Sequence, residues 1–472
     1  MATLSLKRTG INMTEGKLLK SMIAFILPLM ATNLLQLFYS IADTIIVSLS
    51  SNPDAVGAVG ITGSLVGLVL NTVMGLAVGV NVVLARRIGE KDADAVKKVL
   101  HTGISLLLVF GVAFGLVGVV LSKPLLRLMG GREAFLDLAS VYIKIYFCGA
   151  PFIALTNCSA AVLRAKGDTK TTLFILSISG LANVLLNLLF VLGLDMSVAG
   201  VAIATVISNV VSTTLLFAVL MHDKGMCHFS FKNLGFDKGS VKDILKVGIP
   251  VGLQSIFVSF ADTMVASALI KVNDLMSPAN AAYQPVIKGS VAHSSLEGFI
   301  GIATGAISQA SIAFIAQNYG AKKFDRIKKI IGLEYLLMFV FSTVIIAIIT
   351  LLRNPLLSLY GVVDGPVGSL EHIAYQTAMQ KIIVIWFPFG IIAAGNVGLD
   401  GLRAIGHSTL ASVIALSFIC VFRILWILII FSASPTLITL LLCYPVSSAL
   451  MAIAGRIVFG VKLSKEVLIY KE

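Results

Sequence analysis

Two aspartates lie inside long apolar runs at matching places in the two halves of the sequence, Asp43 and Asp262. An acid inside a membrane-spanning helix costs about 2.5 kcal/mol or more, so such residues are candidates for ion or substrate binding. Asp43 follows Pro28 by fifteen residues, which is about 22 Å along a helix and places it in the outer half of a bilayer. The alternative is that the helix ends earlier and leaves Asp43 as a solvated cap.

Other polar side chains occur at the depth of Asp43 on neighbouring apolar segments. Asn183 and Asn187 are four residues apart and therefore share one helix face. Hydroxyl and phenol groups join them: Tyr142, Tyr146, Thr205, Ser208 and Ser212. Oxygens of these kinds, with a carboxylate, can coordinate Na+ or build a protonation site. The alternative is that the Asn, Ser and Thr side chains only tie helices together, at about 0.6 kcal/mol per contact.

Further ionisable residues lie in apolar segments of both halves. Lys144 and Lys381 each precede a proline by seven residues. Each ammonium could pair with the aspartate of its own half or extend to the outer interface, and we expect the second. Glu297 lies in the outer part of its segment, and His293, one turn before it, could titrate near neutral pH.

The elements that must position these residues are membrane helices. Of the 472 residues, 57% are hydrophobic and 12% charged, and the mean hydropathy is +0.98. Too few polar groups remain to cover a soluble surface. Apolar runs long enough to cross a hydrocarbon core of about 30 Å recur along the chain. The sequence predicts twelve, at about 20–48, 55–84, 97–121, 135–161, 169–192, 197–221, 244–270, 281–316, 329–352, 372–400, 409–432 and 436–460.

The loops between these runs differ in charge. With the N-terminus inside, the cytoplasmic segments hold 27 Lys or Arg and the outer loops hold 6. Because Lys and Arg in short loops stay on the cytoplasmic side, both termini are predicted to lie there. The net charge of +13 is then mainly a topology signal. It favours contact with anionic lipid headgroups and gives no reason to expect nucleic-acid binding.

The two halves of the chain repeat one design. Each half starts and ends on the cytoplasmic side, so we expect two six-helix lobes related by a pseudo-twofold axis along the membrane normal. The predicted lobes are residues 1–221 and 242–472, joined by a cytoplasmic linker at 222–241. In carriers, such halves rock around a central site. The matching segments are 42–44 with 261–263, 85–89 with 316–320, and 157–167 with 396–406.

Closely spaced glycines predict that neighbouring helices approach each other. Gly75 and Gly79 form one such set, and Gly60, Gly63 and Gly67 form another. Small residues at this spacing let helix backbones come near one another, so we expect a packing role for both sets.

No enzyme constellation is present in the sequence. It has no phosphate-binding Walker loop, no zinc-ligand spacing and no nucleophile with an identifiable base. The five cysteines form neither a disulfide framework nor a metal-ligand pattern. We therefore expect no catalytic residues and no organic cofactor.

Several motifs resemble those of the multidrug and toxic compound extrusion (MATE) family, in its bacterial drug-exporter branch. The resemblance covers almost the whole length of the chain. Its strongest pieces are MTEG at 13–16, LLQLFYSIADT at 34–44, LRAKGDT at 163–169, AQNYGAKK at 316–323 and CVFRILW at 420–426.

The resemblance implies twelve helices in two lobes and gives roles to several residues. Asp43 matches the family's coupling acid, Asn183 matches an asparagine of its cation site, and Tyr142 and Thr205 resemble polar neighbours. This chain has Asn187 where some members carry a second acid, so its site holds one fewer negative charge. The possible Na+ ligands are then Asp43, Asn183, Asn187 and Thr205.

The function that the resemblance implies is secondary antiport. We expect a monomer in the bacterial inner membrane that exports amphipathic, often cationic, compounds in exchange for H+ or Na+. The candidate ion or substrate residues are Asp43, Tyr142, Lys144, Asn183, Asn187, Thr205, Asp262 and Glu297. The alternative is a lipid-linked precursor flippase of a related fold, for which Lys144 and Lys381 would bind a polar headgroup.

Overall fold

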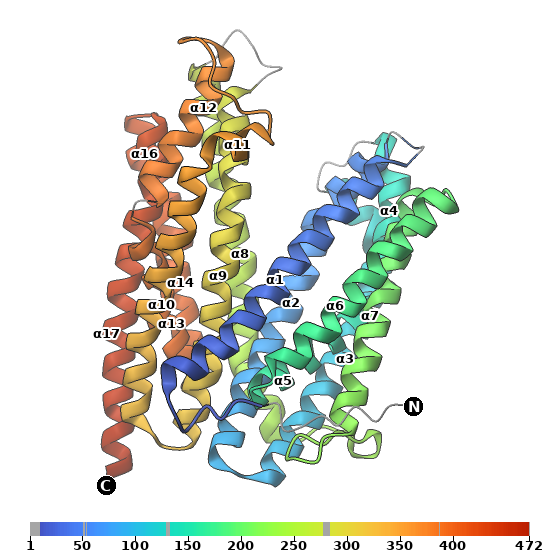
Figure 1. The fold of residues 1–472 in the computed structure, drawn as a ribbon, viewed down its shortest axis with the longest axis vertical. Coiled ribbons are helices and arrows are strands. Elements are labelled where there is room, and N and C mark those ends of the chain that lie inside the picture. The colour runs from blue at the N-terminus through green and yellow to red at the C-terminus, as the bar shows by residue number, and fades with distance from the viewer. Residues whose placement is uncertain are drawn as a thin grey trace. The chain divides into compact units, whose positions relative to one another are not determined.

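The computed structural model describes residues 10–50, 52, 54–128, 133–276, 284–386 and 388–471, and in these ranges it contains helices and turns but no strands (Figure 1). Ten helices in these ranges are long and apolar enough to cross a membrane, and the bent pair α4 and α5 makes an eleventh. The prediction of an all-α polytopic membrane protein is confirmed.

The first six predicted spans coincide with helices or broken helices. The helix following α6 is π-helical and is labelled η1, and α4 and α5 meet at a bend of 47°. The bounds are α1 Leu18–Ser48, α2 Ala55–Glu90, α3 Ala93–Leu128, α4 Glu133–Cys148, α5 Ala150–Lys166, α6 Thr169–Asn187, η1 Leu188–Gly193 and α7 Ser197–Met221.

The last six predicted spans are more often interrupted. The span predicted at 372–400 is divided into α12, the π-helical η3 and α13, and residues 281–283 of the eighth span lie outside the described ranges. The bounds are η2 Phe231–Asn233, α8 Lys238–Met276, α9 Pro285–Gly320, α10 Phe324–Leu351, α11 Arg353–Ser358, α12 Leu370–Lys381, η3 Ile382–Trp386, α13 Phe389–Ala404, α14 Ser408–Ala415, η4 Leu416–Val421, α15 Phe422–Trp426, η5 Ile427–Phe431, α16 Leu437–Leu441 and α17 Cys443–Lys471.

The chain divides into two compact units. The N-terminal unit comprises Met1–Leu253 and Ala316–Lys323, and the C-terminal unit comprises Gln254–Ile315 and Phe324–Glu472. The division therefore falls inside α8 and α9, whereas the predicted lobes meet at the linker. Residues 238–253 belong to the N-terminal unit because this first part of α8 packs against α2 at Gly75 and Gly79.

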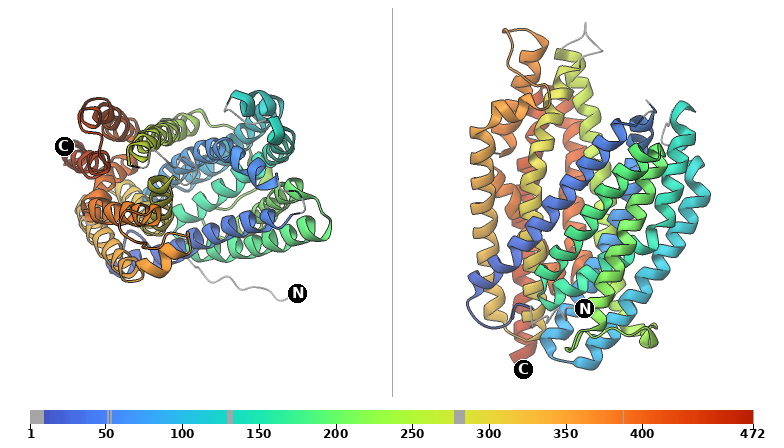
Figure 2. Two further views of the ribbon diagram at one scale, coloured as in Figure 1. Left: turned by 90° about the horizontal axis from the view of Figure 1, so that it is seen from above. Right: turned by 45° about the vertical axis from the view of Figure 1, so that its right-hand side comes forward.

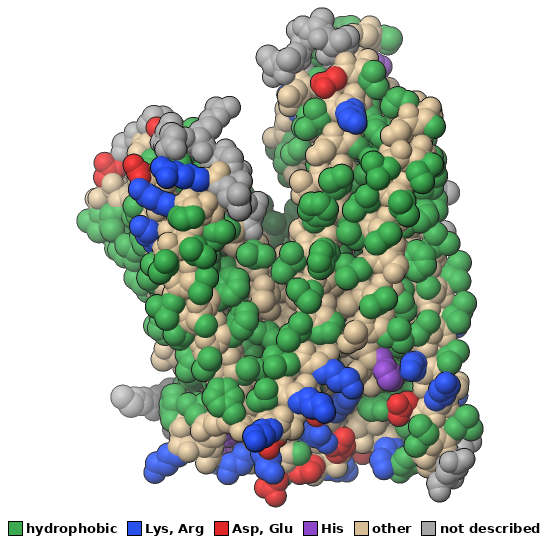
Figure 3. Space-filling view, turned by 180° about the vertical axis from the view of Figure 1, so that it is seen from behind, with side chains coloured by type: hydrophobic (Ala, Val, Ile, Leu, Met, Phe, Trp, Pro, Cys, Tyr) green, Lys and Arg blue, Asp and Glu red, His purple; other side chains and the backbone are tan. Residues whose placement is uncertain are grey.

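Each unit is a helix bundle with an apolar exterior. In the N-terminal unit, α1 packs along α6 and α6 along α7, and in the C-terminal unit α13 packs against α10 and α17 (Figure 2). Exposed side chains on the helix flanks are largely hydrophobic, whereas Lys and Arg gather near helix ends (Figure 3). Apolar flanks of this kind suit contact with lipid tails.

The repeated glycine of the Leu-Arg-Ala-X-Gly motif ends a helix in both halves. Gly167 has φ +96° and Gly406 has φ +87°, a left-handed conformation that glycine adopts without steric cost. The backbone N–H of Asp168 donates to Leu163 O at 2.8 Å, and that of His407 donates to Leu402 O at 2.8 Å. The repeat in the sequence is therefore a repeated helix C-cap.

The two glycine sets have different surroundings. A Cβ atom on Gly75 would lie 2.5 Å from the backbone nitrogen of Gly252, and one on Gly79 would lie 2.5 Å from the carbonyl oxygen of Ile244. The packing prediction is confirmed for these two. It is wrong for Gly60, Gly63 and Gly67, because a Cβ at each of these would meet no other described atom within 4 Å.

The linker is held against α3 through its backbone. The N–H groups of Ser230 and Asp237 donate to His101 Nε2 and Thr102 Oγ1, both at 3.1 Å, and that of Gly235 donates to Ser105 Oγ at 3.2 Å. Because His101 Nε2 accepts, its Nδ1 carries the hydrogen that bonds Lys97 O at 2.7 Å.

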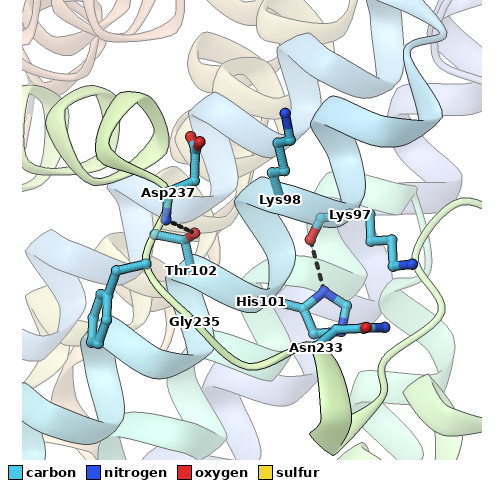
Figure 4. Close-up of a pocket in the computed structure, with 8 residues that line it drawn as sticks. Lys97, Lys98, His101, Thr102, Asn233, Gly235 and Asp237 are labelled. Atoms are coloured by element: carbon cyan, nitrogen blue, oxygen red, sulfur yellow. Dashed lines mark hydrogen bonds between the residues drawn. The ribbon is translucent and has the colours of Figure 1, made fainter.

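The linker and α3 together line a pocket of about 360 Å³ (Figure 4). Helix α3 contributes Lys97, Lys98, His101 and Thr102 to the lining of the pocket, and the linker contributes Asp237. The backbone N–H and side-chain hydroxyl of Ser240 donate to Asp237, and these bonds lower the pKa of its carboxyl group.

We predict that Gly75→Val destabilises the protein and that the matched variant Gly63→Val does not. A side chain at Gly75 must displace the α8 backbone, and overpacking of this kind costs about 1–3 kcal/mol. Thermal unfolding in detergent should show a lower midpoint for Gly75→Val alone. Equal midpoints would contradict the packing assigned to α2 and α8.

We also predict that releasing the linker exposes Cys227. This side chain is 2% exposed, and burial raises the pKa of its thiol to about 12, with Asp223 raising it further and Lys166 lowering it. The double variant His101→Ala/Thr102→Ala removes two hydrogen bonds worth about 1 kcal/mol each. Maleimide labelling of Cys227, with the other cysteines changed to serine, should become roughly tenfold faster or more. Lys123→Ala, at the far end of α3, is the control, and unchanged labelling of the double variant would contradict the linker's attachment.

Candidate functional site

Asp43 lies on α1 where that helix packs along α6. The ring of Tyr39, one turn earlier, rests against Gly180, and its hydroxyl donates to Ser177 O at 3.3 Å. A side chain on Gly180 would occupy the place of that ring, since its Cβ would lie 1.8 Å from Tyr39 Cε2. These contacts hold the Asp43 carboxylate against α6.

The two asparagines of α6 connect Asp43 to α7. Asn187 Nδ2 donates to Asp43 Oδ1 at 2.5 Å and to Asn183 Oδ1 at 3.2 Å. Asn183 Nδ2 in turn donates to Ser208 Oγ at 3.5 Å. Asn187 is fully buried and Asn183 is 6% exposed, so the chain of polar groups runs through the interior of the unit.

The π-helical segment η1 begins directly after Asn187. A π turn holds an extra residue and changes the direction in which neighbouring side chains point, and such turns are frequent at functional sites. Here the change of helix type occurs at the residue that binds Asp43.

Two tyrosines of α4 complete the surroundings of Asp43. Tyr142 lies within electrostatic reach of the carboxylate. Tyr146 stacks on it, with ring centroids 6.2 Å apart and an interplanar angle of 17°. Both rings are buried, so they limit the access of water on that side.

Two other polar residues of α7 bond away from Asp43. Thr205 Oγ1 donates to Val201 O on its own helix at 2.9 Å, and Ser212 Oγ donates to Ser179 Oγ of α6 at 2.6 Å. The structure therefore brings Asp43, Asn183, Asn187 and Tyr142 together, whereas the hydroxyl of Thr205 bonds its own helix.

The amide of Asn187 leaves one acceptor unused. Its Oδ1 is buried and has no hydrogen-bond partner among the described residues. A buried carbonyl oxygen without a donor is costly, and either a monovalent cation or a proton on Asp43 could satisfy it. Oxygens of Asp43, Asn183, Asn187 and Ser208 could serve as ligands of Na+.

Asp262, the repeat counterpart of Asp43, has different surroundings. In the C-terminal unit its carboxylate lies 3.5 Å from the guanidinium of Arg423, and its side chain is 55% exposed. Arg423 also donates to Ser447 Oγ at 3.1 Å and lies over the ring of Tyr444 at 4.4 Å. Asp262 is therefore paired with a cation of its own unit.

The two matched lysines also differ. Lys144 is exposed, whereas Lys381 is buried, 5% exposed, and donates to Ser290 Oγ at 2.9 Å and Ser294 Oγ at 3.0 Å. The expectation that Lys381 extends to the outer interface is wrong, because serines of α9 bind its ammonium inside the unit.

Glu297 and His293 lie on the α9 face that contains these serines. Glu297 is within electrostatic reach of Lys381, and its carboxylate lies 3.9 Å from Nδ1 of His293. The His293 ring is fully buried and packs on Trp386, with centroids 4.7 Å apart. Glu297 and His293, predicted one turn apart, are therefore neighbours, and Lys381 joins them although the sequence predicted it at the outer interface.

A third group of buried charges, Glu334, Asp400 and Arg403 in the C-terminal unit, was not predicted from the sequence. Asp400 and Arg403 lie in the repeated segment 396–406, and the acid inside that segment is the signal that points to them.

Comparison with known proteins gives the family. A model of the MatE family matches residues 28–189 and 289–429. The probable multidrug resistance protein YoeA of Bacillus subtilis is 28% identical over 348 residues, which is 72% of this chain and 73% of that protein. A FAD transporter of Shewanella oneidensis is 25% identical over 424 residues, 88% of each chain.

The fold is also that of solved structures. A crystal structure of MATE in complex with MaL6 matches with a TM-score of 0.87 and 20% identity, over 97% of this chain and 99% of that one. Because the family model covers well over half of the sequence and reaches into both halves, this chain belongs to the MATE family of multi-pass membrane transporters.

Proposed function

We propose that this chain is a secondary antiporter that exports amphipathic compounds, cations foremost, in exchange for H+ or Na+. The observation that carries the proposal is the half-buried carboxylate of Asp43, hydrogen-bonded through Asn187 to Asn183. The names of relatives support the substrate class, since YoeA is described as a multidrug resistance protein. The loop charges support a cytoplasmic location of both termini.

The proposed coupling rests on exclusive use of Asp43. A carboxylate in apolar surroundings is costly unless a cation or a proton neutralises it. If the coupling ion and the cationic substrate both need this group, only one of them binds at a time. Each ligand then shifts the balance between inward-open and outward-open states differently, which couples the two flows.

We predict that Asp43→Asn abolishes gradient-driven efflux. The amide has nearly the shape of the carboxylate and its oxygen can still accept from Asn187, so folding is retained, but it neither ionises nor releases a proton. The measurement is efflux of a fluorescent amphipathic cation from proteoliposomes with Na+ and pH gradients imposed separately. Efflux under one gradient alone identifies the ion in the unmodified protein.

The matched control for this experiment is Asp54→Asn, an exposed acid at the start of α2. This variant should transport normally. Coupled efflux that persists in Asp43→Asn, with normal protein yield, would rule out Asp43 as the coupling acid.

The same assay tests the substrate. FAD is added as a competitor of the fluorescent cation, because the Shewanella relative is named as a FAD transporter.

We further predict that Asn187→Leu weakens coupling while the protein still folds. The substitution removes the donor at 2.5 Å from Asp43, and a hydrogen bond to a charged group is worth about 1.5–3 kcal/mol. Gradient-driven efflux should fall by roughly tenfold or more. Thr205→Val, which removes a hydroxyl bonded only to its own helix in the described residues, should have a smaller effect. The reverse order would show that Asn187 does not position the carboxylate.

A further inference from the structure

Glu334, Asp400 and Arg403 form a group of buried charges in the C-terminal unit, distinct from the Asp43 site. Glu334 of α10 and Asp400 of α13 are both fully buried, and Arg403 is 8% exposed. Arg403 donates to Asp400 Oδ1 at 2.6 Å, and Ser308 of α9 donates to Asp400 Oδ2. Each carboxyl oxygen of Asp400 thus accepts a hydrogen bond.

The guanidinium of Arg403 has further partners. It donates to Gln254 Oε1 of α8 at 3.0 Å, an oxygen that also accepts from Ser412 Oγ of α14 at 3.1 Å. One cation is therefore shared between an amide and the Asp400 carboxylate. It balances a single negative charge.

The side chain of Glu334 lies beside this ion pair, next to Asp400 and Ser311. Asp400 and Arg403 are the charged groups that act on it, and Ser311 of α9 is its polar neighbour. Neither carboxyl oxygen of Glu334 makes a well-formed hydrogen bond within the described residues, and neither does Ser311 Oγ. Among the described residues, two carboxyl groups thus adjoin where Arg403 is the cation that acts on them.

The balance of charges determines whether the carboxyl pair of Glu334 and Asp400 holds a proton. Two adjacent carboxylates in a medium of low dielectric repel strongly, and removing an unpaired ion from water costs several kcal/mol. A proton on Glu334 removes the excess charge. It also supplies an O–H donor that can bond the Asp400 carboxylate, as in carboxyl pairs that share one proton.

The N-terminal half provides an internal comparison. Counting from the matched segments 85–89 and 316–320, Glu334 corresponds to Gly103 and Ser311 to Val80, and counting from the matched arginines, Asp400 corresponds to Ala161. A Cβ on Gly103 would lie 3.0 Å from Val80, so the same place is filled by apolar contact there. The helix scaffold therefore does not need these acids.

We propose that Glu334 and Asp400 form a proton-binding site in the C-terminal unit, at which the two carboxyl groups hold one proton on the Glu334 side and Arg403 pairs with Asp400. The ligand is H+ alone, bound at a carboxyl oxygen of Glu334. The inference goes beyond the proposed function, because it neither uses Asp43 nor assumes which ion is coupled.

Infrared spectroscopy of the purified full-length protein tests the proposal. The carbonyl stretch of a protonated carboxyl group is separate from the bands of a carboxylate. The spectrum of the unmodified protein minus that of Glu334→Gln at neutral pH should contain this band, and labelling with 13C-glutamate should shift it. Glu371→Gln, at an exposed acid of α12, is the control and should lose no such band.

A second variant separates proton sharing from burial alone. In Asp400→Asn, Glu334 has only Arg403 as a charged neighbour, so Glu334 should ionise and the band should disappear although the glutamate is present. Absence of the band in the unmodified protein would overturn the proposal. Persistence of the band in Asp400→Asn would also overturn it, because Glu334 would then hold its proton independently. Neither readout depends on transport, so failure here is distinct from failure at Asp43.

Discussion

The cost of an unneutralised charge in apolar surroundings governs the clusters around Asp43, Asp400 and Lys381. Asn187 binds the Asp43 carboxylate, Arg403 balances Asp400, and serines of α9 surround the ammonium of Lys381. In each case the partner comes from another turn or another helix. Such a charged group is stable only when its protein partner or a bound ligand neutralises or solvates it. A ligand that replaces the partner can therefore bind at such a group without leaving a buried charge unpaired.

The two halves use one backbone plan for different chemistry. The helix cap at Gly167 recurs at Gly406, and its capping hydrogen bond has the same length in both halves. This element therefore ends a helix in each half and carries no charge of its own. The side chains around it differ, as Asp400 replaces an alanine of the first half. Repetition therefore supplies matched helix ends and packing, while each half carries its own arrangement of charges.

Much of the fold could be predicted from the sequence, because the cost of exposing polar groups to lipid sets the length and composition of each span. The asparagine pair on α6 could also be predicted, since residues four apart share a helix face. The π-helical segments could not, because hydropathy does not report the hydrogen-bonding register of a helix. Lys381 was misplaced for a related reason: its serine partners lie about ninety residues earlier in the chain, on α9. Glu334 was missed because a single acid near a helix end looks like an interfacial residue.

The attachment of the linker to α3 has a consequence for how this segment can diverge. The three hydrogen bonds of the attachment are donated by main-chain amides of the linker, so the side chains of Ser230 and Asp237 take no part in them. Nearly any amino acid except proline can supply that amide. The chemical requirement of these bonds falls instead on the imidazole and hydroxyl groups of α3, so positions 230, 235 and 237 could change in homologues while those acceptors, and Phe229 stacked on His101, stay fixed.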